Sequence, residues 1–584
     1  VERVERILAG QETIQPFEFS REAEEIELAW RVREGLHGLV GRLRLPGTAL
    51  IVEDVCVPPE RIAEGARDLQ ALLGEHGFLP GVAGHASAGN LHFMLTPDFA
   101  KEEDTERYES FMAKLVELIV DKYDGSLKAE HGTGVNMAPY VEREWGERAT
   151  ELMWRVKRLA DPDGVLGPGV VLNRDPGAHL RNLKTTPEID DEAATTCVEC
   201  GFCEPVCPSR DLTTTPRQRI VLRREIARQP EGSPLREALE AEYAYDGLET
   251  CAADGSCALA CPLGIDTGEM VKDLREQRHS KRAESLALAA AKRWGAVERA
   301  SRAALRLGGG VARRTKRGAG VPKAAPGRLP ATAREGAAAV YVPSCTNRIF
   351  GRPAARDRSG PAGAGDASSP GGGEPRGLSE ALVAVSSRAG LPLWIPPGLA
   401  GTCCGLPWGS KGHGAARRHK ANEMVERLWK WSGGGELPVV IDAASCSAAI
   451  EVDGVEVLDS VAWAHDRLLP ELEIGRKVDS VALHPTCATR TAALEPRLRR
   501  LAAALADDVY VAPSATCCGF AGDRGFSHPE LTAAATAPQA AELAGRHFDA
   551  HLSSNRTCEI GLTRATGAPY ESFVFLLDEL TRPA

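Results

Sequence analysis

Two cysteine runs near the middle of the chain constrain its fold more than any other feature. One extends from Cys197 to Cys207, and the other, from Cys251 to Cys261, repeats its spacing with Asp254 in place of one cysteine. The spacing C-x2-C-x2-C-x3-C-P is typical of a cubane iron–sulfur cluster, because thiolates two residues apart on a tight loop can surround one corner of a cube. A zinc site is the less favoured alternative, since zinc sites pair two short C-x2-C hooks.

Two such runs predict a helical two-cluster ferredoxin-type domain, which we place at residues 177–285. In modules of this kind the last cysteine of each run ligates the other cluster. One predicted cluster therefore takes Cys197, Cys200, Cys203 and Cys261. The other takes Cys207, Cys251, Cys257 and, in one interpretation, Asp254. Because a carboxylate is a harder and weaker ligand for cluster iron than a thiolate, we expect there either an Asp-ligated 4Fe–4S cluster or, if Asp254 faces solvent, a 3Fe–4S cluster.

Length and charge exclude several classes of protein. A chain of 584 residues is too long for one core and should hold several domains. Its net charge of −11 argues against a nucleic-acid partner. No run of apolar residues predicts a transmembrane helix, and no signal peptide opens the chain. Of the 16 cysteines all but Cys56 fall in motifs of ligand type, which favours a reduced, cytoplasmic metalloprotein.

The first 176 residues contain a second set of metal-ligand residue types. Helical spacing of apolar residues predicts a helix over 21–44, and a buried strand is expected over 47–57, followed by a helix over 60–76. His85 and His92 flank a glycine-bearing bend, and the segment Glu130-His131-Gly132 follows. Two imidazoles and a carboxylate suit a divalent metal with an open coordination position. Taken alone, the histidine spacing is more typical of a structural pair.

Residues 20–175 resemble the C-terminal substrate domain of FAD-linked oxidases of the D-lactate dehydrogenase and glycolate oxidase type. The resemblance rests on the segments 30–34, 52–54, 84–93, 130–132 and 161–173. It implies a ferredoxin-like α+β domain over 1–176 and a divalent metal, zinc or manganese, held by His85, His92 and Glu130. It also implies His131 as the base beside the flavin, Asn90 as a substrate contact and Arg33 as the partner of the substrate carboxylate.

This resemblance is incomplete. The glycine-rich flavin-binding domain that precedes such a domain in the family does not occur in this sequence, and neither do the first strand and helix of the substrate domain. We therefore expect residues 1–176 to be an incomplete domain, and tight FAD binding to require an upstream domain.

Residues 286–337 are predicted to form a linker. Between 272 and 323 there are 15 Lys or Arg against 4 Asp or Glu. A solvated, helix-rich linker is the favoured interpretation, and peripheral contact with an anionic membrane at its inner face is the alternative. Gly308 to Gly310 and the segment 318–336 are expected to be flexible.

The remainder of the chain repeats itself, with one half at 338–470 and the other at 471–584. The motif cysteines of the first half are Cys345, Cys403, Cys404 and Cys446, and they recur as Cys487, Cys517, Cys518 and Cys558. The segment 351–376 is an insertion. Apolar strands adjoin these motifs, so we expect α/β domains with thiolates at the strand ends.

The halves resemble the cysteine-rich CCG domains of glycolate oxidase iron–sulfur subunits and heterodisulfide reductases. The family pattern ends in C-x2-C, but the second position is Ala449 in one half and Gly561 in the other. Each half therefore supplies four thiolates. A cluster in each half and an iron-free pair of adjacent redox thiols are the two interpretations.

Together these features favour an FAD-dependent D-2-hydroxyacid dehydrogenase, with D-lactate preferred over glycolate or 2-hydroxyglutarate. Hydride transfer delivers two electrons at once, and a cytochrome accepts them singly, so a relay of clusters would connect the flavin to a cytochrome, a quinone or another one-electron carrier. One alternative is an electron-transfer subunit that works with a separate flavoprotein. Another is a thiol/disulfide reductase acting at the CCG halves.

Overall fold

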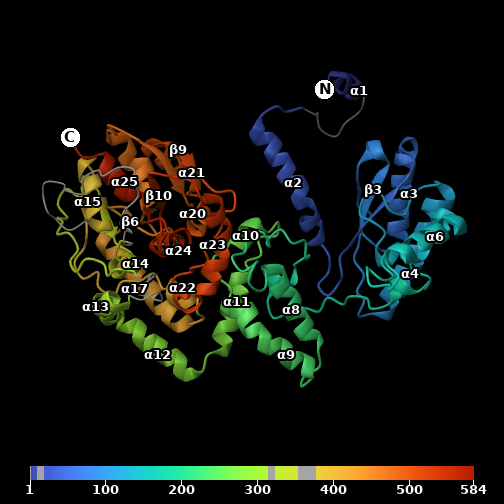
Figure 1. The fold of residues 1–584 in the computed structure, drawn as a ribbon, viewed down its shortest axis with the longest axis horizontal. Coiled ribbons are helices and arrows are strands. Elements are labelled where there is room, and N and C mark those ends of the chain that lie inside the picture. Colours follow the sequence, from blue (N-terminus) through green and yellow to red (C-terminus); the bar gives the residue numbers. More distant parts are fainter. Residues whose placement is uncertain (1, 10–18, 313–321, 353–376, 584) are drawn as a thin grey trace. The chain divides into compact units, whose positions relative to one another are not determined.

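A computed structural model describes residues 2–9, 19–312, 322–352 and 377–583 (Figure 1). The chain divides into two compact units. The first contains residues 1–200 and 223–230, and the second contains 201–222 and 231–584. Within the described residues, no helix combines the length and the apolar character needed to cross a membrane.

The first unit is an α+β arrangement built on a small antiparallel sheet of order β1-β3-β2. Its strands are β1 (Ile51–Cys56), β2 (Val82–Ala83) and β3 (Asn90–Leu95). Its helices are α1 (Glu2–Leu8), α2 (Ala23–Gly41), α3 (Ile62–Glu75), α4 (Glu102–Val116), α5 (Gly134–Met137), α6 (Val141–Ala160) and α7 (Glu192–Thr195).

The core of the first unit joins the sheet to α3 and α4. Leu69 and Leu73 of α3, Phe93 of β3 and Phe111 of α4 are buried together. The predicted helix over 21–44 forms as α2, but its apolar residues Ile26, Leu28, Trp30 and Val32 are exposed.

Alternation along β1 places consecutive carboxylates on opposite faces of the sheet. Asp54 pairs with His92 of β3, and Glu53 pairs with Phe93. A bridge between Cys56 and Ser126 brings the segment that leads to Glu130 alongside β1. The strand register therefore gathers residues that lie far apart in sequence.

The second unit begins with a helical part. Its helices are α8 (Pro216–Arg228), whose last residues belong to the first unit, α9 (Pro234–Tyr243), α10 (Ser256–Ala260), α11 (Thr267–Arg278), α12 (Lys281–Lys292) and α13 (Trp294–Ala312). Side chains of Ser233, Asp266 and Ser280 cap α9, α11 and α12 by accepting hydrogen bonds from backbone N–H groups.

The predicted linker contains helices, as expected, but it differs from the prediction at its triple glycine. Gly308 to Gly310 lie within α13, although the sequence predicts flexibility there. The reason is packing, because α12 and α13 contact the first half of the repeat. Glu298 of α13 forms a buried ion pair with Arg348 and accepts a hydrogen bond from the backbone N–H of Gly401 at 2.7 Å. Residues 313–321 of the basic stretch and 353–376 of the insertion lie outside the described residues.

The two halves of the repeat share one topology. In the first, the parallel sheet has the order β5-β4-β6-β7, and in the second the order is β9-β8-β10-β11. The strands are β4 (Ala339–Val342), β5 (Leu393–Trp394), β6 (Val439–Ile441), β7 (Val457–Asp459), β8 (Val478–Leu483), β9 (Ala506–Tyr510), β10 (Ala550–Ser553) and β11 (Tyr570–Ser572).

Helices cover these parallel sheets, and the central strands are buried and nearly continuous in apolar residues, as parallel sheets require. The first half contains α14 (Cys345–Ile349), α15 (Leu378–Arg388), α16 (Leu406–Gly409), α17 (Gly414–Ser432), α18 (Ala444–Ser447) and α19 (Ser460–Ala462). The second contains α20 (Cys487–Thr491), α21 (Glu495–Leu505), α22 (Arg524–Ser527), α23 (Pro529–Leu543), α24 (Arg556–Thr566) and α25 (Phe573–Leu580). The mixed α+β and α/β architecture predicted from the sequence is confirmed.

Candidate metal centres

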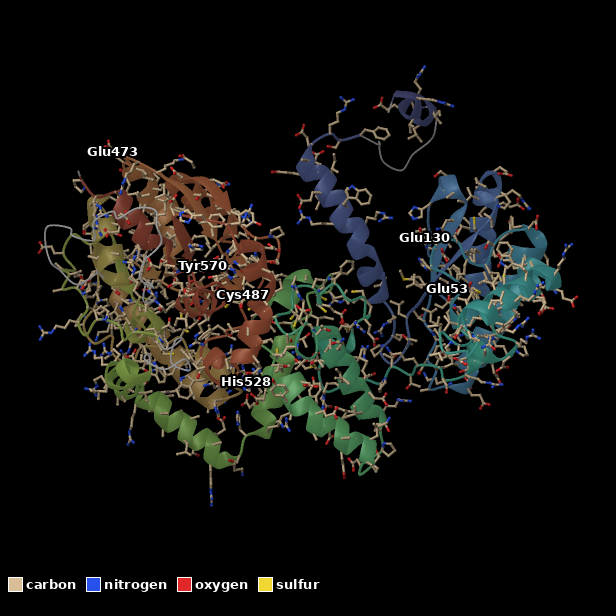
Figure 2. The ribbon with its side chains drawn as sticks, in the orientation of Figure 1. Glu53, Glu130, Glu473, Cys487, His528 and Tyr570 are labelled. Carbon is tan, nitrogen blue, oxygen red and sulfur yellow. The ribbon has the colours of Figure 1, made fainter. Side chains whose placement is uncertain are left out.

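In the first unit, the three predicted metal ligands converge. Oε1 of Glu130 lies 3.3 Å from Nε2 of His85 and 2.9 Å from Nε2 of His92 (Figure 2 labels Glu130). The rings of the two histidines meet edge to face with centroids 5.4 Å apart. One carboxylate oxygen therefore faces two imidazole nitrogens, as a mononuclear divalent site requires.

The bend between the histidines depends on Gly89, which has a φ of +72°. A Cβ atom at this position would lie 1.9 Å from the carbonyl oxygen of Val57. The backbones of His85 and Asn90 bond to each other across the bend, which fixes the start of β3. Glycine therefore allows the chain to turn tightly enough to bring both imidazoles to one place.

Asp54 orients this site, and its role was missed from the sequence. Its Oδ2 accepts hydrogen bonds from the backbone N–H groups of Glu130 at 2.6 Å and His131 at 3.2 Å. Its Oδ1 is buried without a hydrogen-bond partner among the described residues and lies 3.9 Å from Nδ1 of His131. Donor atoms of Asp54, His92, Glu130 and His131 all lie within 4.8 Å of one another.

The predicted catalytic residues differ in their placement. His131 stacks on His92 with ring centroids 5.0 Å apart, so it lies beside the predicted metal ligands. Asn90 is buried at the start of β3, two residues before His92 and thus on the same face of the strand. Arg33 lies on α2, is exposed and contacts the ring of Trp30. Among the described residues, the structure does not bring Arg33 to the histidines.

The donor set of this group fits a divalent ion. Burial lowers the pKa of His92, and the neighbouring His131 acts in the same direction, so its imidazole is neutral and can ligate near neutral pH. Imidazole and carboxylate donors suit zinc or manganese.

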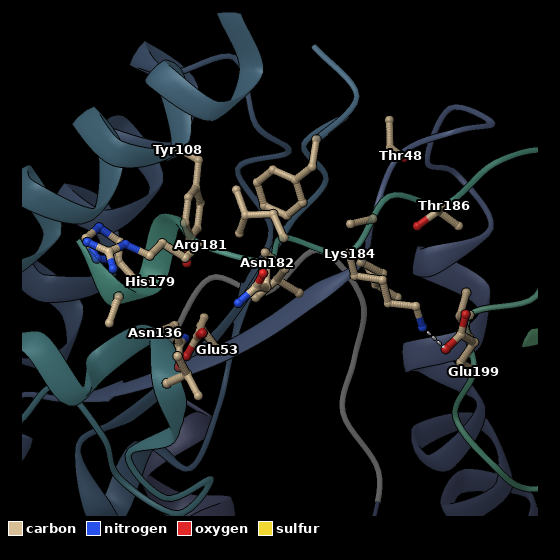
Figure 3. A pocket seen from close by; sticks show the side chains of 18 of the residues that line it. Thr48, Glu53, Tyr108, Asn136, His179, Arg181, Asn182, Lys184, Thr186 and Glu199 are labelled. Carbon is tan, nitrogen blue, oxygen red and sulfur yellow. Dashed lines mark hydrogen bonds and ion pairs between the residues drawn. The ribbon is translucent and has the colours of Figure 1, made fainter. Parts of the chain in front are cut away.

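A cavity of about 800 Å³ in the same unit was not predicted (Figure 3). Tyr108 and His179 lie at one end of it, and Lys184 pairs with Glu199 at the other. Burial lowers the pKa of His179 and raises that of Tyr108. Its lining residues are scattered from 44 to 224, so no local motif indicates it.

In the second unit, three of the predicted cluster ligands line one small pocket together with Asp254. Cys207, Cys251 and Cys257 are all buried there. The buried guanidinium of Arg219 donates to Sγ of Cys207 at 3.7 Å. Burial acts to lower the pKa of Arg219, but the nearby sulfurs of Cys251 and Cys207 raise it above its ordinary value. A buried cation beside thiolate donors fits an anionic cluster.

The other predicted cluster set involves both units of the chain. Cys197 and Cys200 belong to the first unit, and Cys203 and Cys261 belong to the second. This ligand set remains a prediction.

The four motif cysteines of each half gather at the carboxyl ends of its parallel strands. In the first half, the thiol of Cys345 donates a hydrogen bond to the sulfur of Cys403, and Sγ of Cys404 lies 3.2 Å from Sγ of Cys446. The second half repeats this order in Cys487, Cys517, Cys518 and Cys558 (Figure 2 labels Cys487).

The hydrogen bond to its partner thiol, and then burial, raise the pKa of Cys345 and of Cys487. Sets of four clustered thiols with disfavoured thiolates fit a soft metal centre, because metal coordination supplies the charge that stabilises them.

A shared turn supports several of these sulfurs. The backbone N–H two residues after the cysteine donates to its Sγ at 3.4 Å in each case, and that residue has a positive φ. The donors are Glu199, Ala253, Gly405 and Gly519. Hydrogen bonds to ligand sulfurs are one of the means by which proteins set cluster potentials.

Three regions of the chain match known protein families. Residues 1–171 match the C-terminal domain of FAD linked oxidases. Residues 193–265 match the 4Fe-4S dicluster domain, and 481–563, in the second half of the repeat, match the cysteine-rich domain.

Curated relatives cover parts of the chain. D-2-hydroxyglutarate dehydrogenase of Haemophilus influenzae is 27% identical over 315 residues, which cover 45% of this chain and 30% of that protein. The mitochondrial D-lactate dehydrogenase [cytochrome] of Arabidopsis thaliana is 31% identical over 157 residues, 27% of each chain. Glycolate oxidase subunit GlcD of Bacillus subtilis is 29% identical over 175 residues, 30% of this chain and 36% of its own.

The chain spans about a third or less of the length of the first two of these relatives. It contains regions that match the C-terminal domain of FAD linked oxidases, the 4Fe-4S dicluster domain and the cysteine-rich domain.

Proposed function

We propose that this chain belongs to an FAD-dependent dehydrogenase of D-2-hydroxy acids that passes electrons through iron–sulfur centres. The observation that carries the proposal is the convergence of His85, His92 and Glu130, with His131 stacked beside them, inside the region that matches the oxidase domain. The same chain carries clustered thiols suited to electron transfer.

The side chains of this group suit the removal of hydrogen from a 2-hydroxy acid. A divalent ion held by His85, His92 and Glu130 would lower the pKa of the substrate hydroxyl and orient it. His131 is the base that would take the hydroxyl proton, since a neutral imidazole is well suited to this near pH 7. Asn90 would contact the substrate.

Bound flavin would accept the C2 hydride, and bound clusters would pass its electrons on singly. Asp54, by accepting hydrogen bonds from the backbone of Glu130 and His131, holds the segment that carries both residues. The N–H groups that donate to cysteine sulfurs hold the thiol-bearing turns in the second unit. A cytochrome or a quinone is the acceptor that this arrangement favours.

D-2-hydroxyglutarate is the first substrate to test, with D-lactate second. Relatives named D-2-hydroxyglutarate dehydrogenase align over 45% and 47% of this chain, a larger share than the oxidase region alone. Those named D-lactate dehydrogenase align over 27% and 31%.

The substitution His131→Ala tests the proposal in the protein encoded by the complete reading frame. General base catalysis contributes about 10²- to 10⁴-fold, so turnover with a D-2-hydroxy acid should fall by about that factor while the iron content stays unchanged. His547→Ala, at an exposed histidine of the second unit, is the matched control. Unchanged turnover in His131→Ala would overturn the role assigned to His131. Absence of turnover in the parent protein would instead favour an electron-transfer subunit without its own oxidation site.

A further inference from the structure

Asp254, which replaces a cysteine in the second ferredoxin run, lies among thiols of a different domain. Its carboxylate oxygen and the sulfurs of Cys487 and Cys517 all lie within 4.8 Å of one another. The carboxylate accepts hydrogen bonds from Ser256 and from the Cys517 thiol. These three residues come from two modules that are more than 200 positions apart in sequence.

Local backbone geometry directs this approach. Gly255, next to Asp254, has a φ of +76° and is the N-cap residue of α10, which packs against α20. A Cβ atom on Gly255 would lie 3.5 Å from Cγ2 of Thr491, at the end of α20. Because Cys487 begins α20, the contact between the two helices brings Asp254 to the thiols.

Further polar contacts hold the two modules together. Arg524 donates to the backbone carbonyl of Glu249 at 2.6 Å and pairs with its carboxylate at 3.0 Å. His528, labelled in Figure 2, lies 3.2 Å from the same carboxylate. Tyr245 donates to Glu530 at 3.0 Å. Asp254 and the thiols therefore lie within an extended contact between the ferredoxin-type module and the second half of the repeat.

The second half of the repeat also lacks the fifth cysteine of the family pattern, and the carboxylate of Asp254 would take the place of that donor. It supplies four thiols, and Gly561 stands where a fifth cysteine is expected. A Cβ atom on Gly561 would lie 3.0 Å from the methyl carbon of Thr532 and 3.2 Å from the ring of Phe520. That position is thus closely packed. Among the described residues, no such group of thiols and a carboxylate occurs in the first half.

We propose that Asp254 is an oxygen ligand of the metal centre formed by the cysteines of the second half, among which Cys487 and Cys517 lie nearest to its carboxylate. The centre at Cys207, Cys251 and Cys257 would then have three protein ligands, as a 3Fe–4S cluster does. The assignment rests on the proposed function only in assuming that the thiol groups hold iron. The second half would then have a hard oxygen donor, which the described residues of the first half do not offer beside their thiols.

The placement of this ligand has a consequence for electron transfer. Asp254 lies three residues from Cys251 and three from Cys257. A ligand at this position joins the two metal centres through a short stretch of backbone. The ferredoxin module and the second half would therefore exchange electrons directly.

The test compares variants of the full chain after anaerobic reconstitution with iron and sulfide. Cys518→Ser identifies the spectral signal of the second half, and Cys251→Ser identifies that of the ferredoxin centre. Asp254→Asn removes the anionic oxygen and keeps the shape of the side chain. Asp273→Asn, at an exposed aspartate of α11, controls for the loss of one charge. Electron paramagnetic resonance, Mössbauer spectra and iron content are recorded for each protein.

Asp254→Asn should lose or displace the signal that Cys518→Ser removes, while Asp273→Asn matches the parent protein. A change confined to the signal that Cys251→Ser removes, or no change at all, would overturn the proposal. So would a Cys518→Ser protein with an unaltered spectrum, since it would mean that the second half holds no metal. Failure to oxidise any D-2-hydroxy acid would instead overturn the proposed function, and the spectra would still decide the ligand.

Discussion

At the scale of single residues, Glu130 is central because one of its oxygens faces both His85 and His92. Glu130→Gln replaces the anionic donor by a neutral amide of the same shape. We expect divalent metal affinity to fall by at least about tenfold, measured by calorimetric titration with zinc and manganese. Glu102→Gln, at an exposed glutamate of α4, should bind as the parent does. Equal affinity in the two variants would contradict the ligand set.

Gly89 offers a second test at this scale. Gly89→Ala adds a Cβ atom 1.9 Å from a backbone oxygen at a residue with positive φ, so the first unit should lose at least about 1–3 kcal/mol of stability. Gly77→Ala is the matched control, because Gly77 also has a positive φ but its Cβ would have no contact closer than 3.7 Å. Thermal melting should show a larger loss for Gly89→Ala. Equal losses would mean that the contact with Val57 is not decisive.

Residue types and a resemblance predict candidate donors for this site, but not the residue that orients them. His85, His92 and Glu130 could be named because their types and a resemblance indicate metal binding. Asp54 could be noticed only as part of a matched segment, since its role depends on the register that pairs it with His92. Arg33 was predicted to lie at the site, but the structure does not bring it to the histidines. The position of Arg33 depends on the packing of α2, which local sequence does not determine.

At the scale of elements, the junction of β7 and α19 contains a buried carboxyl group. Asp459 caps α19 by accepting a hydrogen bond from the N–H of Val461 at 2.7 Å, and its other oxygen has no hydrogen-bond partner among the described residues. Burial raises its pKa from 3.8 to about 7, and the nearby Asp442 adds to the shift. The folded protein therefore binds this proton more tightly than the unfolded chain does.

The stability contributed by protonated Asp459 is complete below its ordinary pKa and is lost as the pH rises to about 7. Between about pH 5 and about pH 8, the parent should lose about 3 kcal/mol relative to Asp459→Asn, which cannot ionise. Urea unfolding at both pH values measures the difference. Asp453→Asn, at an exposed position of the same half, should follow the parent. A pH-independent difference between Asp459→Asn and the parent would contradict the raised pKa.

The formation of helices α12 and α13 could be predicted from the sequence, but their tertiary contacts could not. Their composition indicated a solvated, helix-rich linker, and the helices do form. Composition could not reveal that Glu298 pairs with Arg348, because that ion pair depends on the fold of a domain that begins later in the chain. The triple glycine therefore lies in a helix whose earlier turns are fixed by tertiary contacts.

At the scale of the whole molecule, the repeat could be recognised from the order of its cysteines, and its two sheets have the same strand order. Asp254 could not be assigned in this way. Its spacing places it in the ferredoxin run, but packing between α10 and α20 brings it to thiols of the second half. Local spacing thus predicts candidate metal ligands, while the partners of a residue at a domain contact can be identified only from the fold.

In the proposed function, electrons from a D-2-hydroxy acid enter the iron–sulfur centres of this protein. The direct measurement is an anaerobic optical titration of the complete protein, loaded with FAD and iron, with D-2-hydroxyglutarate, D-lactate, glycolate and the L enantiomers of the chiral acids. We expect one or more of the D-2-hydroxy acids to bleach the flavin and then the cluster absorption, and the L enantiomers to leave both unchanged. Full reduction by dithionite without bleaching by any D-2-hydroxy acid would contradict the proposed function.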